Sequence, residues 1–386
     1  MIDINDIREN LETFSFPRLS GTEHEVKAFK ILKNRVDALK LKPVVQNFSF
    51  STFYSRIYPK IASILMFWIL LVLYLSFNEY FVLINILIII ILYLPLFIIT
   101  RKPEKIRIGK RMNSQNLYLK IPTNSEENFA KKGNILIMSH IDSKGQRFTT
   151  IFRGKIFRFW IYSFITSFVF LILRGLFFPE LILLFYIFGA ILLIINLIST
   201  IFVLLNTTNN KSQGALDDAS GISCVLELLK YYQNSQSRLT NYTMWFIFTG
   251  AEESGTMGIR HLYNETLKDF DRFNTIALNF DSIGKNPIIF SSAREDHPHY
   301  HLYKKFFENS QNFNAKLNAK RPFISIARSD GSFLYHQGFR GMGFGDINAY
   351  KYLHSINDTL DKVDPLILKK LCLQIINFLE EIDKET

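Results

Sequence analysis

The sequence predicts an α/β fold, a mixed and largely parallel sheet flanked by helices, with two inserted transmembrane helical hairpins. Two observations predict it. Four apolar stretches are each near the ~20 residues needed to cross the hydrocarbon core of a bilayer, and the rest of the chain alternates short apolar runs with helical patterns. In addition, the 386 residues are 48% hydrophobic and include 37 Phe, a high content for a protein wholly in water.

The apolar stretches come in two pairs, 61–77 with 81–99 and 159–178 with 181–205. A helix buried in a soluble core rarely stays apolar on every face for five turns, so we interpret the pairs as membrane hairpins rather than core helices. The hairpins, 58–100 and 156–205, divide the remaining chain into three pieces, 1–57, 101–155 and 206–386, which we expect to form one domain.

Within those pieces, strands are predicted at 44–51, 116–121, 133–139, 242–249 and 275–280, and an amphipathic helix at 221–232. Chemistry in such sheets gathers at the carboxyl ends of the strands. The polar residues that follow a predicted strand, precede the helix or lie in the polar segment before the last helix are His140, Asp142, Asp217, Glu252, Glu253, Asp281 and His354.

Two imidazoles and several carboxylates are the ligand types that a pair of zinc ions needs. The adjacent Asp217 and Asp218 would repel each other, and a shared metal charge would make that repulsion tolerable. Taken singly, each residue has an ordinary alternative: His140 as a buried core histidine, the Glu252–Glu253 pair as a solvated helix start. Five candidates in order favour the metal.

The segments SHIDS, GALDDASG, TGAEESG, NFDS and LHSINDT, in this order, resemble the signature of the M28 family of zinc aminopeptidases. FPRLSGTEHEVKAFKILKNRV resembles that family's opening helix and its R-x-x-G-T turn, and ARSDGSF resembles its segment before the C-terminal region. The resemblance covers essentially all of the chain outside the hairpins.

The resemblance implies a zinc-exopeptidase fold, two zinc ions per chain and peptide substrates cleaved at a free N-terminus. It also implies roles for individual residues. One zinc would be held by His140, Asp217 and Asp281, and the other by Asp217, Glu253 and His354. Glu252 would be the general base that activates a bridging water, Asp142 would orient His140, and a cis peptide often follows the bridging aspartate.

Three alternatives stay open: an M28-like carboxypeptidase, a glutaminyl cyclase, and a non-catalytic membrane receptor or scaffold with the same fold. A cyclase-type site uses one zinc, and the complete ligand set disfavours it. The presence of Glu252 with all five ligands disfavours a receptor. A second cluster, the EDHPHYH run at 295–301, follows no strand and is predicted to be a surface loop.

The net charge of +11 does not favour nucleic-acid binding, because many basic residues flank the hairpins. Lys and Arg near span ends mark the cytoplasmic side, and the loops on the side of the polar pieces hold Arg101, Lys102, Lys105, Arg107, Lys110, Arg111, Lys144, Arg147, Arg153, Lys155 and Arg158. The opposite loops hold only Arg174. We therefore predict an integral membrane protein whose catalytic domain faces the cytoplasm.

Two further expectations follow from the sequence. Cys224 and Cys372 are predicted to be core thiols, since two cysteines make no disulfide framework and the polar start of the chain has no secretory signal pattern. The 12 residues from Leu205 to Asp217 reach at most ~40 Å, which predicts an active site close to the bilayer surface. Substrate preference and oligomeric state cannot be predicted.

Overall fold

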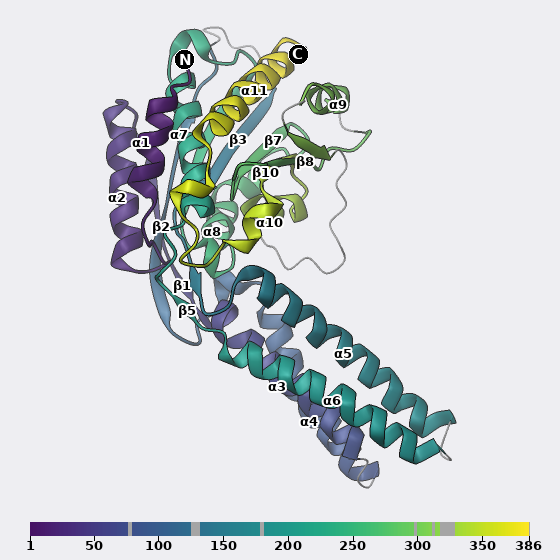
Figure 1. Ribbon diagram of the computed structural model, residues 1–386. Coiled ribbons are helices and arrows are strands. Elements are labelled where there is room, and N and C mark those ends of the chain that lie inside the picture. Colours follow the sequence, from purple (N-terminus) through teal and green to yellow (C-terminus); the bar gives the residue numbers. More distant parts are fainter. Residues whose placement is uncertain are drawn as a thin grey trace. The chain divides into compact units, whose positions relative to one another are not determined.

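The computed structural model describes residues 1–75, 79–124, 132–177, 181–296, 299–310, 313–316 and 329–385 (Figure 1). It divides into two compact units. The first unit consists of Met1–Ser49, Met112–Gly145 and Asn209–Thr386, and the second of Phe50–Arg111 and Gln146–Thr208. Each unit is therefore assembled from segments that lie far apart in the sequence.

The first unit is built on an eight-stranded sheet with the order β1-β2-β6-β3-β7-β10-β8-β9. Strands β6, β3, β7 and β10 are parallel to one another, whereas β2 is antiparallel to β6 and β8 is antiparallel to β10. The predicted mixed, largely parallel sheet is confirmed. The strands are β1 (Val44–Ser51), β2 (Arg111–Ile121), β3 (Gly133–His140), β6 (Tyr242–Thr249), β7 (Thr275–Phe280), β8 (Ile288–Ser291), β9 (Asn314–Lys316) and β10 (Arg340–Gly345).

Helices cover both faces of this sheet, because alternate side chains of its buried strands point to opposite sides. In β3, Ile135 and Ile137 belong to a core shared with α1, α2, α7, α9 and α11, whereas Leu136 and Met138 belong to a second core with α8 and α10. The helices are α1 (Ile4–Phe14), α2 (Glu23–Ala38), α7 (Ser220–Tyr232), α8 (Met257–Glu265), α9 (Tyr300–Asn309), α10 (Asp330–His336) and α11 (Pro365–Lys384). Cys224 and Cys372 are free and buried, as predicted.

The second unit contains four long helices, α3 (Tyr58–Leu75), α4 (Glu79–Ile99), α5 (Thr150–Phe177) and α6 (Ile182–Leu205), with α5 packed along α6 and α3. Short strands β4 (Gly145–Gln146) and β5 (Thr208–Asn209) flank the second pair. Four segments of 20 to 24 residues are long and apolar enough to cross a membrane: Phe53–Leu75, Tyr80–Ile99, Thr150–Leu173 and Leu183–Leu205.

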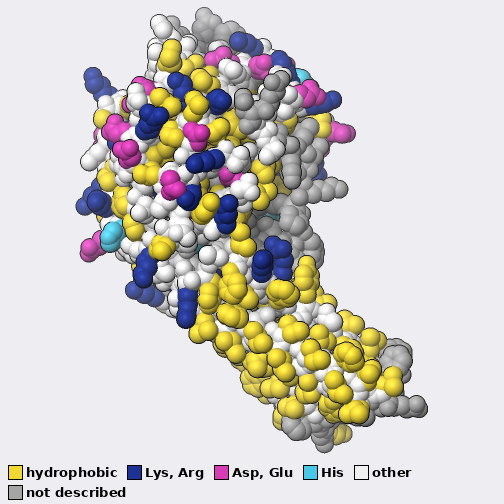
Figure 2. All heavy atoms as spheres, viewed as in Figure 1, with side chains coloured by type: hydrophobic (Ala, Val, Ile, Leu, Met, Phe, Trp, Pro, Cys, Tyr) yellow, Lys and Arg dark blue, Asp and Glu magenta, His cyan; other side chains and the backbone are white. Residues whose placement is uncertain are grey.

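The face of these helices that Figure 2 shows is mostly hydrophobic. At most 28% of any of the four spans is buried inside the structure, so their apolar side chains face outward, as they do in lipid-exposed helices. The third span begins before the predicted apolar stretch: α5 starts at Thr150, which places Arg153 in its first turn rather than in a loop.

Candidate metal centre

The carboxyl ends of three adjacent parallel strands, β6, β3 and β7, meet at one edge of the sheet. His140 is the last residue of β3, and Asp281 directly follows β7. Glu252 and Glu253 begin a short 3-10 turn, η6 (Glu252–Ser254), three residues after β6 ends. The sequence patterns that end each strand therefore bring these four side chains to the same edge.

Two further residues reach the edge from irregular segments. Asp217 lies in a π-helical turn, η4 (Ala215–Ala219), that leads into α7, and its peptide bond to Asp218 is cis. His354 lies between two 3-10 turns, η8 (Ile347–Lys351) and η9 (Leu360–Lys362), with a φ of 60°.

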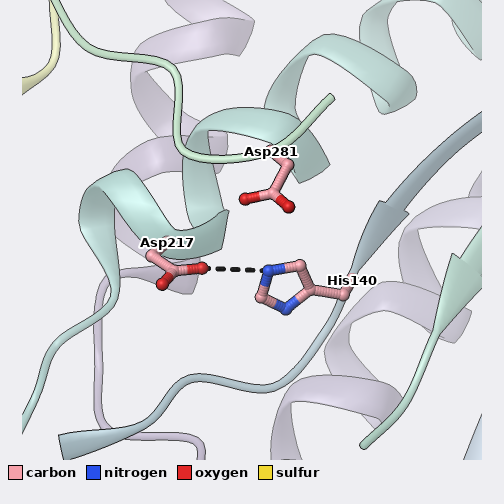
Figure 3. Close-up of side chains that lie close together, drawn as sticks. All are labelled: His140, Asp217 and Asp281. Atoms are coloured by element: carbon pink, nitrogen blue, oxygen red, sulfur yellow. Dashed lines mark ion pairs between the residues drawn. The ribbon is translucent and has the colours of Figure 1, made fainter. Parts of the chain in front are cut away.

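All five predicted ligands lie together, in two groups that share Asp217. In each group, His140 with Asp217 and Asp281, and Asp217 with Glu253 and His354, the possible ligand atoms lie within 4.8 Å of one another. His140 Nε2 is 2.9 Å from Asp217 Oδ1 (Figure 3), and His354 Nε2 is 3.2 Å from Asp217 Oδ2 and 2.7 Å from Glu253 Oε1. Each oxygen of Asp217 thus faces a different imidazole, one from each of the two groups.

The donor atoms fit metal cations better than they fit one another. His140 Nδ1 lies 2.9 Å from the main-chain oxygen of Asp142, and a carbonyl only accepts, so Nδ1 carries a proton. Nε2 then has no proton to donate to Asp217 Oδ1, the oxygen that it faces (Figure 3), and neither this nitrogen nor Glu253 Oε1 makes a hydrogen bond of good geometry within the described chain, although each lies close to an ion-pair partner. Buried polar atoms are normally hydrogen-bonded, so an unprotonated nitrogen and carboxylate oxygens that face one another suit a cation between them.

Asp142 contacts this site in two ways. Its main-chain oxygen orients the His140 ring, while its carboxylate is farther away, with Oδ1 3.6 Å from Nδ1. The carboxylate instead accepts from the main-chain N–H groups of Glu252 and Glu253, at 3.0 and 3.1 Å, and from the hydroxyl of Ser20. Asp142 therefore ties the end of β3 to the turn after β6.

Glu252 belongs to neither of the two groups that the described residues form, although its neighbours are members of them. Burial raises the pKa of Glu252 well above its usual range, and the nearby carboxylates of Asp330, Glu253 and Asp281 add to the rise while His140 opposes it. A carboxyl group that favours a proton and holds no cation is suited to accept and release protons.

The pKa values of the other carboxyl groups in the site depend on burial and on the charged groups beside them. Burial would raise the pKa of Asp217, but the two imidazoles outweigh burial and lower it well below its usual range. Burial would also raise the pKa of Glu253, but His354 and Lys144 outweigh burial and lower it. Burial raises the pKa of Asp281 to about 6, with a contribution from Asp217. Acidic groups thus outnumber basic ones in a buried space, which favours cation binding.

Three residues with evident roles were not predicted. Lys144 Nζ lies 2.7 Å from Glu253 Oε2, so it neutralises the carboxylate oxygen that faces away from His354. Asp218 accepts from the main-chain N–H groups of His140, Gly221 and Ser282 at 3.0 to 3.2 Å, and so joins three segments of the site. Asp358 accepts from the main-chain N–H of Leu216 at 2.6 Å. All three stand inside or directly beside quoted motifs, but their partners are distant in sequence.

The EDHPHYH run does not join the site. Glu295 and Asp296 are exposed, as the surface-loop prediction requires, but Tyr300 and His301 begin α9, so this end of the run is helical and not a loop. His299 lies 2.9 Å from the hydroxyl of Tyr242, and His301 pairs with a glutamate near the C-terminus. The rest of the run, 297–298, and the first two residues of ARSDGSF, 327–328, lie outside the described residues.

The model of peptidase family M28 matches residues 199–379, a segment that contains four of the five predicted ligands and Glu252 but not His140. Over this segment the chain is similar to peptidase family M28. A search of curated protein sequences finds no match.

The fold of the chain is similar to that of solved zinc exopeptidases. It is similar to an aminopeptidase from Aneurinibacillus sp. strain AM-1 (TM-score 0.55, 14% identity, 98% of this chain and 93% of that one). It is also similar to BSAP, a zinc aminopeptidase from Bacillus subtilis (0.55, 12%, 99% and 96%). A glutaminyl cyclase from Fimbriiglobus ruber is nearly as similar (0.54, 13%, 98% and 95%), so the fold alone does not separate the two activities.

Proposed function

We propose that the chain is a membrane-bound metallopeptidase that holds two zinc ions and removes residues from the free N-termini of peptides. The observation that carries this proposal is the sharing of Asp217 by two groups of possible ligands. A single-metal site needs only one such group. The match of residues 199–379 to peptidase family M28 supports peptide hydrolysis.

In the proposed site, His140 and Asp281 would hold one zinc, Glu253 and His354 the other, and Asp217 would bridge them. Zinc in such a site supplies a lowered pKa for water and polarisation of the scissile carbonyl. Glu252 would accept a proton from the attacking water and deliver it to the leaving amine, because its pKa is raised while its neighbours hold the metal. Lys144 would keep the second oxygen of Glu253 occupied, so that one oxygen is offered to the metal.

The membrane location rests on the second unit. Its four spans expose apolar side chains over lengths that match a bilayer core. The Lys and Arg residues beside the spans support a catalytic domain on the cytoplasmic side. The bilayer would thus be the partner of the second unit, and peptides the partners of the first.

Glutaminyl cyclase is a second candidate, favoured by the similarity to the Fimbriiglobus ruber enzyme. One experiment separates the two. Detergent-purified protein is dialysed against zinc, freed of excess metal and assayed for zinc per chain. Three reactions are then measured: release of the first residue from a peptide with a free N-terminus, release of the first residue from an N-acetylated peptide, and cyclisation of an N-terminal glutamine. Two zinc ions and cleavage of the free peptide alone support the aminopeptidase. One zinc with cyclisation would refute it.

A further inference from the structure

The N-terminal R-x-x-G-T turn has no part in the proposed chemistry, yet residues 18–25 contact three segments of the site: the one after β3, the one before Asp217 and the turn after β6. We call residues 18–25, which join α1 to the first turn of α2, the N-terminal clamp. Its polar side chains Arg18, Ser20 and Glu25 are all buried, at 0%, 0% and 3% exposure. Burial of an arginine and a glutamate is costly unless their polar atoms are paired, so their partners show what the clamp does.

Arg18 connects the segments that carry two of the proposed ligands. Its Nε donates to the main-chain oxygen of Ile141, the residue after His140, at 2.8 Å. Its Nη1 and Nη2 donate to the oxygens of Gln213 and Gly214, just before the turn that contains Asp217, at 2.9 and 3.1 Å. A planar guanidinium with donors in a fixed fork sets the spacing of these main chains, which a flexible lysine would not do.

The clamp also runs along the segment after His140. Ser143 N donates to the Arg18 main-chain oxygen at 3.0 Å, and Arg18 N donates to the Ser143 hydroxyl at 2.9 Å. Between these contacts, the Ser20 hydroxyl donates to the Asp142 carboxylate. The clamp therefore fixes the carboxylate that in turn accepts from Glu252 and Glu253.

Glu25 acts on the turn after β6. Its Oε1 accepts from the main-chain N–H of Ala251 at 3.0 Å and from the Ser114 hydroxyl at 2.7 Å, and its Oε2 accepts from Gly21 N at 2.5 Å. Gly250 N donates to the side chain of Asn116 at 3.0 Å. With the two contacts of Asp142, the four consecutive N–H groups of 250–253 all end on buried side-chain oxygens.

The turn after β6 contains residues in an unfavourable main-chain conformation, which these hydrogen-bond acceptors stabilise. Ala251 and Thr256 have φ values of 51° and 56°, in the left-handed region that is unfavourable for residues with a Cβ. Strained conformations persist only where the surrounding structure over-determines them. Glu252 is the next residue after Ala251, so the contact made by Glu25 holds the strained residue beside the proposed base.

We propose that the N-terminal clamp positions the metal centre: Glu25 sets the turn that presents Glu252 and Glu253, and Arg18 sets the segments that present His140 and Asp217. This inference rests on the proposed function, because it concerns the geometry of that same site. Glu25, Ser20 and Arg18 are positioning residues, which act through the main chain and do not touch metal or substrate.

The test compares Glu25→Gln with Glu23→Gln, an exposed glutamate in the same first turn of α2. The carboxamide of Glu25→Gln must turn its NH₂ toward the N–H of either Gly21 or Ala251, so one main-chain donor loses its acceptor. We expect kcat to fall about 10- to 100-fold with KM unchanged, and we expect the visible absorption of the cobalt-substituted protein to change, since that spectrum reports the coordination geometry. Glu23→Gln should match the wild type in both.

If Glu25→Gln fails to fold, Ser20→Ala takes its place, because it removes one hydroxyl from Asp142. It should alter the cobalt spectrum, and Ser20→Thr, which keeps the hydroxyl, should restore it. The positioning role is overturned if Glu25→Gln folds and has the same cobalt spectrum and kcat as Glu23→Gln. If Glu25→Gln does not fold, the same result for Ser20→Ala overturns it. Neither result would affect the proposed function. A wild-type protein that binds neither zinc nor cobalt would overturn the proposed function and this inference together.

Discussion

The neighbouring glutamates Glu252 and Glu253 allow a sharp test, because the same substitution should have two different effects. Glu252→Gln keeps the size of the side chain and, through the main-chain N–H, the contact with Asp142, but a carboxamide cannot take a proton. Loss of a positioned general base costs about 10² to 10⁴ in turnover, or about 3 to 5 kcal/mol in activation free energy. Because Glu252 lies in neither ligand group, we expect zinc content to remain at the wild-type value.

Glu253→Gln should instead weaken zinc binding. Its Oε1 faces His354 and its Oε2 faces Lys144, so the substitution removes an anionic ligand and leaves the Lys144 charge without its counterion. We expect the affinity of one of the two zinc ions to fall by at least 10-fold, a magnitude that altered partners of metal ligands already reach. Turnover should recover in part when zinc is added in excess, which it should not do in Glu252→Gln.

The measurements are zinc per chain by atomic emission after a chelator titration, and steady-state cleavage of a peptide with a free N-terminus, on detergent-purified variants. Far-UV circular dichroism provides the control for folding. Loss of zinc from Glu252→Gln, together with retention of two zinc ions and slow turnover in Glu253→Gln, would show that the order of base and ligand is the reverse of the one proposed here.

Three further predictions concern residues around the site. Lys144→Met should weaken zinc binding by about 10-fold, and by more as pH falls, because without Lys144 the pKa of Glu253 rises and protons compete with zinc for its carboxylate. Chelator competition at two pH values measures the loss of affinity, and an equal loss at both would contradict the prediction. Asp218→Asn should lower the free energy of unfolding by about 1 to 3 kcal/mol, since one buried N–H loses its acceptor, and an unchanged denaturation midpoint would count against this. Lys211→Cys, exposed and tested with Cys224 and Cys372 replaced, should resist an impermeant thiol reagent in intact cells; labelling would place the domain outside.

The strands that carry the site could be predicted from sequence because each is a short, almost unbroken apolar run. β6 and β7 have the predicted bounds, and β3 extends by one residue to include His140. Their polar end residues follow at once, and parallel neighbours bring these ends to one edge. The family resemblance supplied the pairing of ligands, which periodicity alone does not contain.

β8 and β10 were not predicted. β10 reads RGMGFG, and glycine weakens a strand signal. Its glycines reflect tertiary packing: a Cβ at Gly341 would lie 1.8 Å from the main-chain oxygen of Ala277 in β7. β8 is only four residues long and is held by β10. Such strands exist because of a neighbouring strand, so local sequence does not reveal them.

The side chains that support the site were missed for the same reason. Asp218, Lys144 and Glu25 each contact at least one segment more than 60 residues away. A helix cap or a surface salt bridge would explain each of them locally. Long-range contacts depend on the register of the sheet and on the path of loops, and neither can be read from one sequence.

The charge inventory of the site gives a final consequence. Without a metal, a buried cluster of carboxylates must hold protons: burial raises the pKa of Asp281 to about 6, and the carboxylates of Asp142 and Asp217 outweigh burial to raise that of His140 well above its usual range. Zinc binds the deprotonated forms, so metal binding displaces these protons. Zinc titrations by calorimetry in two buffers with different ionisation enthalpies should therefore show proton release that increases as pH falls toward 6. Identical heats in the two buffers would mean that the ligands are already deprotonated, and that these raised pKa values do not describe the metal-free site.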